Sequence, residues 1–440
     1  MIGSDLLFTN IYTISGENEP TMSTLSVEQI NNAVKLNTFT DSRFKTLGLS
    51  VDLLLPLEEA TAAQRGILPA LATRATRRYP DYTALSCRLA ELYGASLRSG
   101  VRKFGEYQVL ELSVSGIASR YAFGGEDMLA ELSQLLFDAL FDPLLDGEGE
   151  FPQEGFQQEK RQLLELKDAE YNDKMVYARR RCEELLFQGQ RAGIDRCGSR
   201  EAVQNLRREG LYQAWRQTLE TARIEIFALG DCQPEASAFR RRFQGIGQPR
   251  LLGKAPYQEP KEVLRVTEEQ PVSQGKLSLA YRVDAAPQER MLFQLVNAVL
   301  GGTVSSKLFL NVREKMSLCY YCSSAFSWAS GAMFIDSGVE PSNMDRAEEA
   351  IQAQLDAICQ GDVTVEELSH AKLAMKNSLG SGADSLPAVE NWYLSRAFDL
   401  PTQSPEDAAD LLTHYTADDV VQAARRLKHA VSYRLKGGAG

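Results

Sequence analysis

The order of predicted helices and strands in the first half of the chain recurs in the second half. Residues 89–116 run LAELYGASLRSGVRKFGEYQVLELSVSG, and residues 308–338 run LFLNVREKMSLCYYCSSAFSWASGAMFIDSG. In both segments a helix leads through a turn into a strand, a tight turn and a second strand that ends in Ser-Gly. A recurring order limits the fold strongly, because both copies must bury equivalent apolar faces. The sequence therefore predicts a duplicated unit of roughly 200 residues.

Each copy is predicted to be an α+β unit, with one mostly antiparallel sheet and helices on one of its faces. The predicted strands are 44–57, a pair within 95–117, 222–231, 275–284, a pair within 317–340, and 429–437. The predicted helices are 58–76, 79–94, 126–145, a helix or helix pair over 155–187, 210–219, 288–302, 303–316, 344–359, 363–381 and 416–427. The stretch 244–260 is rich in Gly and Pro and reads as a linker, so we expect halves at 1–243 and 261–440.

Composition excludes several classes of protein. The chain has 440 residues, 44% of them hydrophobic and 24% charged, as in globular proteins. Its longest apolar stretches, such as 291–300, fall short of the roughly 18 residues that a membrane helix needs. The N-terminus lacks the basic region of a secretory signal, so the cytoplasm is the expected location. A net charge of −11 argues against a general nucleic-acid-binding surface.

Cysteines and histidines limit the metal and redox chemistry. The seven cysteines are odd in number and mostly scattered, which favours free or buried thiols over a disulfide framework. Cys319 and Cys322 form a CxxC in a strand-like run, where packing is the favoured interpretation and a chemical role stays open. The histidines His370, His414 and His429 form no HxxxH or HxxEH pair. A zinc site within this chain would therefore need ligands far apart in sequence.

The block LGGTVSSKLFLNVREKMSLCYYCSS resembles the C-terminal-half signature of the pitrilysin/insulinase family of zinc peptidases. Members show an LGG…SSxLFxxxREKxxLxY pattern there, and their duplicated α+β halves also match. The matching residues are Gly301, Gly302, Ser306, Leu308, Phe309, Arg313, Glu314, Lys315, Leu318 and Tyr320. The resemblance covers nearly the whole chain, from about residue 40 to residue 437.

The resemblance implies roles for residues of this block. An Arg and a Tyr at the spacing of Arg313 and Tyr320 bind the peptide near its scissile carbonyl, and a guanidinium and a phenol can both donate to an oxyanion. Ser305, Ser306 and Phe309 would line the substrate. The alternative is that Arg313 pairs with a helix carboxylate and Tyr320 packs in the sheet.

The departure from the family is in the first half. Active members carry HxxEH on the first helix, with two histidine ligands, a Glu as general base and a downstream Glu as third ligand. The alignment is anchored on Thr76, Tyr79 and Pro80, which match the family's pattern after that helix. Counting back places Gly66, Pro69 and Ala70 in the His, Glu and His positions. None can bind zinc or act as a base, although Glu159 and Glu165 lie near the usual third-ligand position.

The resemblance thus implies the non-catalytic subunit of a two-chain zinc endopeptidase, forming half of a clamshell. Such a chain would hold no cofactor, be inactive alone, and supply Arg313 and Tyr320 to a homologous HxxEH-containing partner that binds the zinc. The substrate would be a peptide or peptide leader, with no nucleic acid and no membrane involved. The alternatives are a peptide- or protein-binding scaffold without proteolysis and, less favoured, a hydrolase using Ser305 or Ser306. The last lacks a GxSxG elbow.

Overall fold

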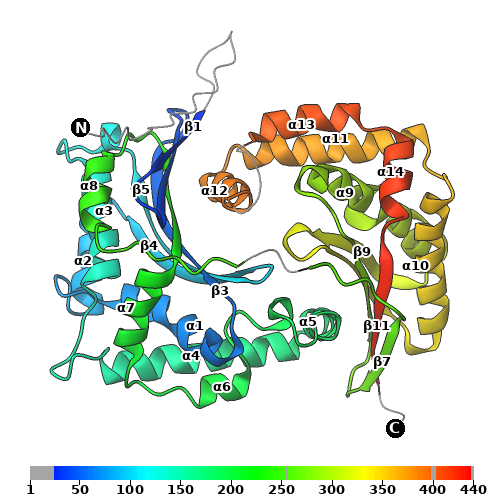
Figure 1. Cartoon of the computed structure of the whole chain (residues 1–440), viewed down its shortest axis with the longest axis horizontal. Coiled ribbons are helices and arrows are strands. Elements are labelled where there is room, and N and C mark those ends of the chain that lie inside the picture. Colours follow the sequence, from blue (N-terminus) through cyan, green and yellow to red (C-terminus); the bar gives the residue numbers. More distant parts are fainter. Residues whose placement is uncertain (1–23, 253–255, 398–402, 438–440) are drawn as a thin grey trace, which may run out of the picture. The chain divides into compact units, whose positions relative to one another are not determined.

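The computed structural model describes residues 24–252, 256–397 and 403–437 (Figure 1). The chain divides into two compact units, Met1–Glu165 with Ile194–Gly253, and Leu166–Gly193 with Lys254–Gly440. The second unit therefore includes residues 166–193, which come before the second part of the first unit in the chain. The predicted linker 244–260 lies partly outside the described residues, and the division of the chain at that linker stays a prediction.

The first unit is built on a six-stranded sheet in the order β1-β2-β6-β3-β5-β4. Its strands are β1 (Thr24–Gln29), β2 (Val34–Thr40), β3 (Thr46–Pro56), β4 (Ser96–Phe104), β5 (Tyr107–Ile117) and β6 (Arg223–Gly230). The β2-β6 pair is parallel and the other neighbours are antiparallel. The strand β4 ends the order, so one of its backbone edges has no partner within this sheet.

The second unit is built on a five-stranded sheet in the order β7-β11-β8-β10-β9. Its strands are β7 (Leu264–Glu269), β8 (Gly275–Arg282), β9 (Cys319–Ser327), β10 (Ala332–Val339) and β11 (Lys428–Lys436). The β7-β11 pair is parallel and the other pairs are antiparallel. This order repeats β2-β6-β3-β5-β4 strand for strand, parallel pair included. The predicted α+β class is confirmed, with two mixed, mostly antiparallel sheets.

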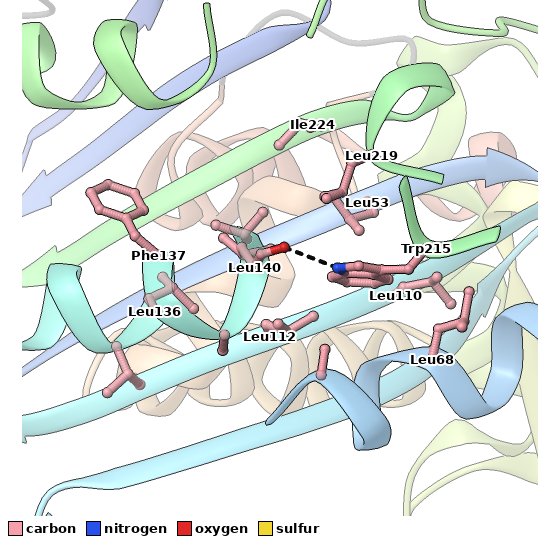
Figure 2. Close-up of a cluster of buried hydrophobic side chains, with 14 of the residues drawn as sticks. Leu53, Leu68, Leu110, Leu112, Leu136, Phe137, Leu140, Trp215, Leu219 and Ile224 are labelled. Atoms are coloured by element: carbon pink, nitrogen blue, oxygen red, sulfur yellow. Dashed lines mark hydrogen bonds between the residues drawn. The ribbon is translucent and has the colours of Figure 1, made fainter. Parts of the chain in front are cut away.

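Every second residue of β3 is buried in the core of the first unit. Its odd-numbered residues, from Leu47 to Leu55, are at most 1% exposed and pack with the helices, as period-two alternation requires. These helices include α1 (Glu59–Arg74), α3 (Met128–Phe141) and α7 (Leu211–Thr221). Trp215 on α7 is fully buried and donates from Nε1 to the Leu140 carbonyl at 2.9 Å (Figure 2).

The sheet of the second unit is covered on both faces. On one face, odd-numbered residues of β8 such as Leu277 and Leu279 join a core with α9 (Arg290–Asn297), α10 (Met344–Cys359) and α14 (Ala417–Ala424). On the other face, α5 (Lys174–Leu186) packs through Cys182 against Phe334 and Tyr433. The sequence predicted helices on one face only, and α5 adds a cover to the second face because its apolar stripe fits the apolar residues there.

Three of the remaining helices lie in predicted segments: α2 (Tyr82–Glu91), α4 (Gln153–Asn172) and α11 (Val365–Gly382). The sequence did not predict the other four, which are α6 (Arg200–Gln204), α8 (Ala236–Arg242), α12 (Leu386–Leu394) and α13 (Pro405–His414). The segment 155–187 forms two helices, because Asp173 caps α5 by accepting from the Met175 and Val176 amides. None of the helices in the described ranges has the length and hydropathy to span a bilayer.

Candidate functional site

The helix α1 carries the three positions that the family resemblance assigns to zinc chemistry. Gly66 and Pro69 are buried, and Ala70 lines a cavity of about 850 Å³. A Cβ on Gly66 would lie 3.1 Å from the Cα of Cys197, so a histidine side chain there would displace the segment packed on the helix. None of the three residues offers a nitrogen, sulfur or carboxylate ligand from its side chain.

An ion pair occupies the side of this cavity where the third-ligand position was expected. Arg74 of α1 donates to Glu159 of α4 at 2.8 Å and to the side-chain oxygen of Gln158 at 2.6 Å. The Glu159 side chain is only 11% exposed, so it is held in a largely desolvated pair. The second candidate, Glu165, is instead 70% exposed and lies 3.9 Å from Arg161.

The donor set around α1 therefore does not fit zinc. The three motif positions supply no ligand, and the one carboxylate near the cavity is neutralised by a guanidinium. A cation binds beside a carboxylate only if it replaces or outcompetes the cation already paired there. The sequence located Glu159 near this site but missed Arg74, whose pairing partner lies 85 residues away along the chain.

The same cavity runs beside the edge strand β4. Its lining includes Ser96, Leu97, Arg98 and Ser99 of that strand, together with Tyr82 of α2. The guanidinium of Arg98 is exposed, and the Ser99 hydroxyl hydrogen bonds with Thr73 at 3.2 Å. Polar side chains and an unpaired strand edge thus line one recess in the first unit.

In the second unit, the signature block forms two π-helical segments and the start of β9. These segments are η4 (Ala298–Gly302) and η5 (Leu308–Lys315). A Cβ on Gly301 would come within 2.8 Å of the Ser324 backbone nitrogen on β9, so the glycine permits this close approach. Buried Lys307 at the start of η5 pairs with Glu367 of α11 at 2.8 Å. These contacts hold η4 against β9 and the start of η5 against α11.

The predicted substrate-lining residues differ in how available they are. Ser306 is 1% exposed, and its hydroxyl donates to the Thr303 carbonyl at 2.6 Å, so it stabilises the turn before η5. The Ser305 hydroxyl lies 3.2 Å from that of Thr303. Phe309 is half-buried, and the Arg313 guanidinium stacks 4.6 Å from the centre of its ring. Their part in substrate binding stays a prediction.

Arg313 and Tyr320 both reach the surface of the second unit. The Arg313 side chain is 40% exposed and lies 3.5 Å from the carboxylate of Glu314. Tyr320 is 58% exposed rather than packed in the sheet, and its hydroxyl donates to Glu340. That hydrogen bond, followed by the charge of Glu340, raises the pKa of Tyr320. The phenol therefore remains protonated, and able to donate, at neutral pH.

The chain is similar to proteins described as inactive or uncharacterized peptidases. A family model described as Peptidase M16 inactive domain matches residues 205–375. Among curated proteins, the probable inactive metalloprotease YmfF of Bacillus subtilis is 28% identical over 408 residues, covering 90% of this chain and 94% of that protein. The uncharacterized zinc protease YmxG of the same species is 28% identical over 190 residues, covering 41% of this chain and 45% of that protein.

Solved structures share the fold over nearly the whole chain. A conserved protein from Enterococcus faecalis V583 superposes with a TM-score of 0.86 at 28% identity, covering 95% of this chain and 100% of that one. A peptidase M16 inactive domain from Pseudomonas fluorescens superposes with a TM-score of 0.74 at 16% identity, covering 94% and 99%. The second likeness concerns the fold alone.

Proposed function

Because the chain is a homologue of the M16 peptidase inactive domain, we propose that it is the non-catalytic subunit of a two-chain zinc endopeptidase. In this proposal a homologous HxxEH-containing chain binds the zinc and supplies the general base. The present chain binds the peptide and contributes Arg313 and Tyr320 near the carbonyl that is attacked. It needs no cofactor of its own.

One asymmetry carries the proposal. The zinc-motif positions of α1 hold Gly66, Pro69 and Ala70, whereas Arg313 and Tyr320 of the signature block are retained and exposed. A chain that works only beside a zinc-binding partner needs those donors and no zinc ligands.

The local chemistry suits donation to a developing oxyanion. The Arg313 guanidinium offers a planar fork of N–H donors and is oriented by stacking on Phe309. The raised pKa of Tyr320 keeps its phenol protonated, and the hydroxyl can exchange its bond to Glu340 for a bond to substrate. Removing one donor of this kind typically lowers kcat by roughly 10²–10³-fold.

The test is a peptide-cleavage assay on the complex assembled with an HxxEH-containing homologue. Arg313→Lys keeps the charge but loses the planar fork, and Tyr320→Phe keeps the ring but loses the hydroxyl. Each is expected to lower kcat and kcat/KM together by roughly 10²–10³-fold, with assembly and thermal stability unchanged. The matched controls are Arg346→Lys, an exposed arginine on α10, and Tyr321→Phe on the same strand as Tyr320.

Two results would reject this role. One is wild-type cleavage by correctly assembled Arg313→Lys and Tyr320→Phe complexes. The other is full activity of the HxxEH-containing chain without the present one. Either would leave this protein without a part in catalysis.

A second candidate function is a peptide-binding scaffold without proteolysis. The observation that favours it is the cavity of about 850 Å³ beside the edge strand β4, where a bound peptide could add a strand through backbone hydrogen bonds. Fluorescence anisotropy of labelled peptides with the isolated chain would test it. Under the scaffold reading Arg98→Gln weakens binding of acidic peptides, and Arg313→Lys leaves that binding unchanged.

A further inference from the structure

The strand β9 contains a bulge at Tyr320. Cys322 and Tyr321 pair with Ser337 and Gly338 of β10, but the next β10 residue, Val339, pairs with Cys319. Tyr320 is therefore the extra residue of β9, left without a partner on β10. A bulge of this kind re-aims side chains and is often found beside functional sites.

The bulge changes which faces the two cysteines occupy. In a regular strand, residues three apart point to opposite faces, because side chains alternate with a period of two. The extra residue removes that offset, and Cys319 and Cys322 come to share the face that packs on the helices. Each thiol lies close enough to the other to shift its pKa. Cys322 is 4% exposed, whereas Cys319 is half-buried and open to reagents.

We propose that Cys319 and Cys322 form a reversible dithiol–disulfide pair whose oxidation reshapes the bulge that presents Tyr320. Both cysteines are free, so their sulfur atoms lie farther apart than in a disulfide. Closing it must therefore draw Cys319 toward Cys322 and move Tyr320, which lies between them in the chain. The consequence for substrate binding rests on the function proposed above, whereas disulfide formation itself does not.

The environments of the two thiols give the two cysteines different roles in the reaction. The neighbouring Cys322 thiol, with smaller contributions from Ser337 and the Arg313 guanidinium, lowers the pKa of Cys319 to about 7. The neighbouring Cys319 and burial raise the pKa of Cys322. At pH 7 a thiol with a pKa of about 7 is about half thiolate, against roughly 3% for an ordinary cysteine with a pKa near 8.5. Cys319 is thus the attacking sulfur and Cys322 the resolving one.

The reaction requires a low-molecular-weight disulfide as oxidant. The Cys319 thiolate attacks one sulfur of that disulfide, forms a mixed disulfide and releases a thiolate. The released thiolate takes the proton of Cys322, whose sulfur then attacks Cys319 and displaces the second thiolate. That thiolate takes up from solvent the proton that Cys319 released when it ionised. The two cysteines together lose two electrons and two protons, which convert the added disulfide into two free thiols.

Peptide mapping of the full chain tests whether the bond forms. The protein is equilibrated with mixtures of reduced and oxidised glutathione at pH 7, alkylated and digested with trypsin, which cuts after Lys315 and Arg346. As the mixture becomes oxidising, the 316–346 peptide should lose the mass of two hydrogen atoms and take up no alkyl group. If both its cysteines are still alkylated when exposed Cys87 has become glutathionylated, the proposal is overturned.

Single substitutions test the assigned order of attack. In Cys322→Ser the mixed disulfide should accumulate on Cys319, because no resolving thiol remains. In Cys319→Ser the buried Cys322 should stay reduced throughout the same series. If Cys322 of that variant becomes glutathionylated as fast as Cys319 of the wild type, the assigned roles are wrong.

The effect on Tyr320 has its own readouts. Hydrogen exchange of residues 319–322 should differ between the reduced and oxidised proteins, while that of β8 stays the same. In the assembled complex, oxidation should lower cleavage by an amount similar to Tyr320→Phe, and Cys319→Ser with Cys322→Ser should abolish the redox effect. If Tyr320→Phe has no effect but the disulfide forms, the proposed function fails and the redox pair stands. If the disulfide forms without altered exchange, the coupling to Tyr320 fails.

Discussion

The ion pair between Arg74 and Glu159 should be a measurable part of the stability of the first unit. At 2.8 Å and an effective dielectric constant near 20, Coulomb's law gives a gross attraction of about 6 kcal/mol. Desolvation offsets much of this, because the two side chains are only 29% and 11% exposed. We therefore expect a net coupling of about 1.5–3 kcal/mol, the range found for hydrogen bonds to charged groups.

A double-mutant cycle isolates that coupling. Arg74→Gln leaves Glu159 partly buried without its cation, Glu159→Gln leaves the guanidinium with Gln158, and the double variant removes both charges. Each single variant should unfold at lower urea concentration than the wild type, and the double variant should recover part of the loss. The matched control is the exposed pair Arg161 and Glu165, whose coupling should be at most about 0.5 kcal/mol.

Salt distinguishes the two pairs further. Raising ionic strength should abolish the exposed coupling and leave most of the Arg74–Glu159 coupling, because partly buried charges are screened less. A coupling for Arg74 and Glu159 below about 0.3 kcal/mol, within the usual error of additivity, would show that the cavity beside α1 is not held by this pair.

Three further outcomes follow from contacts in the two cores. Trp215→Phe should cost about 1–3 kcal/mol of unfolding free energy, because it leaves the Leu140 carbonyl buried without a donor; urea denaturation measures it, and no change would contradict the contact. Gly301→Ala should cost about 1–3 kcal/mol, because its methyl group would meet the Ser324 backbone; an unchanged thermal midpoint would refute this. Burial lowers the pKa of His429, so the unfolded chain binds its proton at higher pH than the folded chain. The stability that neutral His429 supports should be complete above about pH 6.5 and be lost as pH falls through its lowered pKa, and His429→Asn should remove that dependence.

Much of the fold could be read from local pattern. The alternation of β3 and β8 and the strand pairs ending in Ser-Gly depend on neighbouring residues, and such patterns located most of the described elements. The strands β1, β2 and β7 and the helices α6, α8, α12 and α13 were missed. The recurring order predicted the duplication, which the matching strand orders of the two sheets bear out. The parallel pairs β2-β6 and β7-β11 were not predicted, because pairing of strands distant in sequence leaves no local signature.

The candidate site, too, was predictable from the sequence only in part. The absence of histidine before His370 and the residues Gly66, Pro69 and Ala70 are properties of the sequence alone. The alternation in CYYCSSAF predicted a strand, but the chain itself gave no sign that an extra residue would put both cysteines on one face. That outcome depends on the register of β9 against β10.

By itself the sequence determined most of the element order, the α+β class and the absence of an HxxEH motif, because periodicity and residue identity act over short range. Only the tertiary structure decided that α5 covers the second unit's sheet, that Arg74 meets Glu159, and that the bulge exposes Tyr320. Each of these joins residues distant along the chain or depends on strand register. Such contacts form only when the packing of the whole unit brings complementary apolar surfaces and charges together.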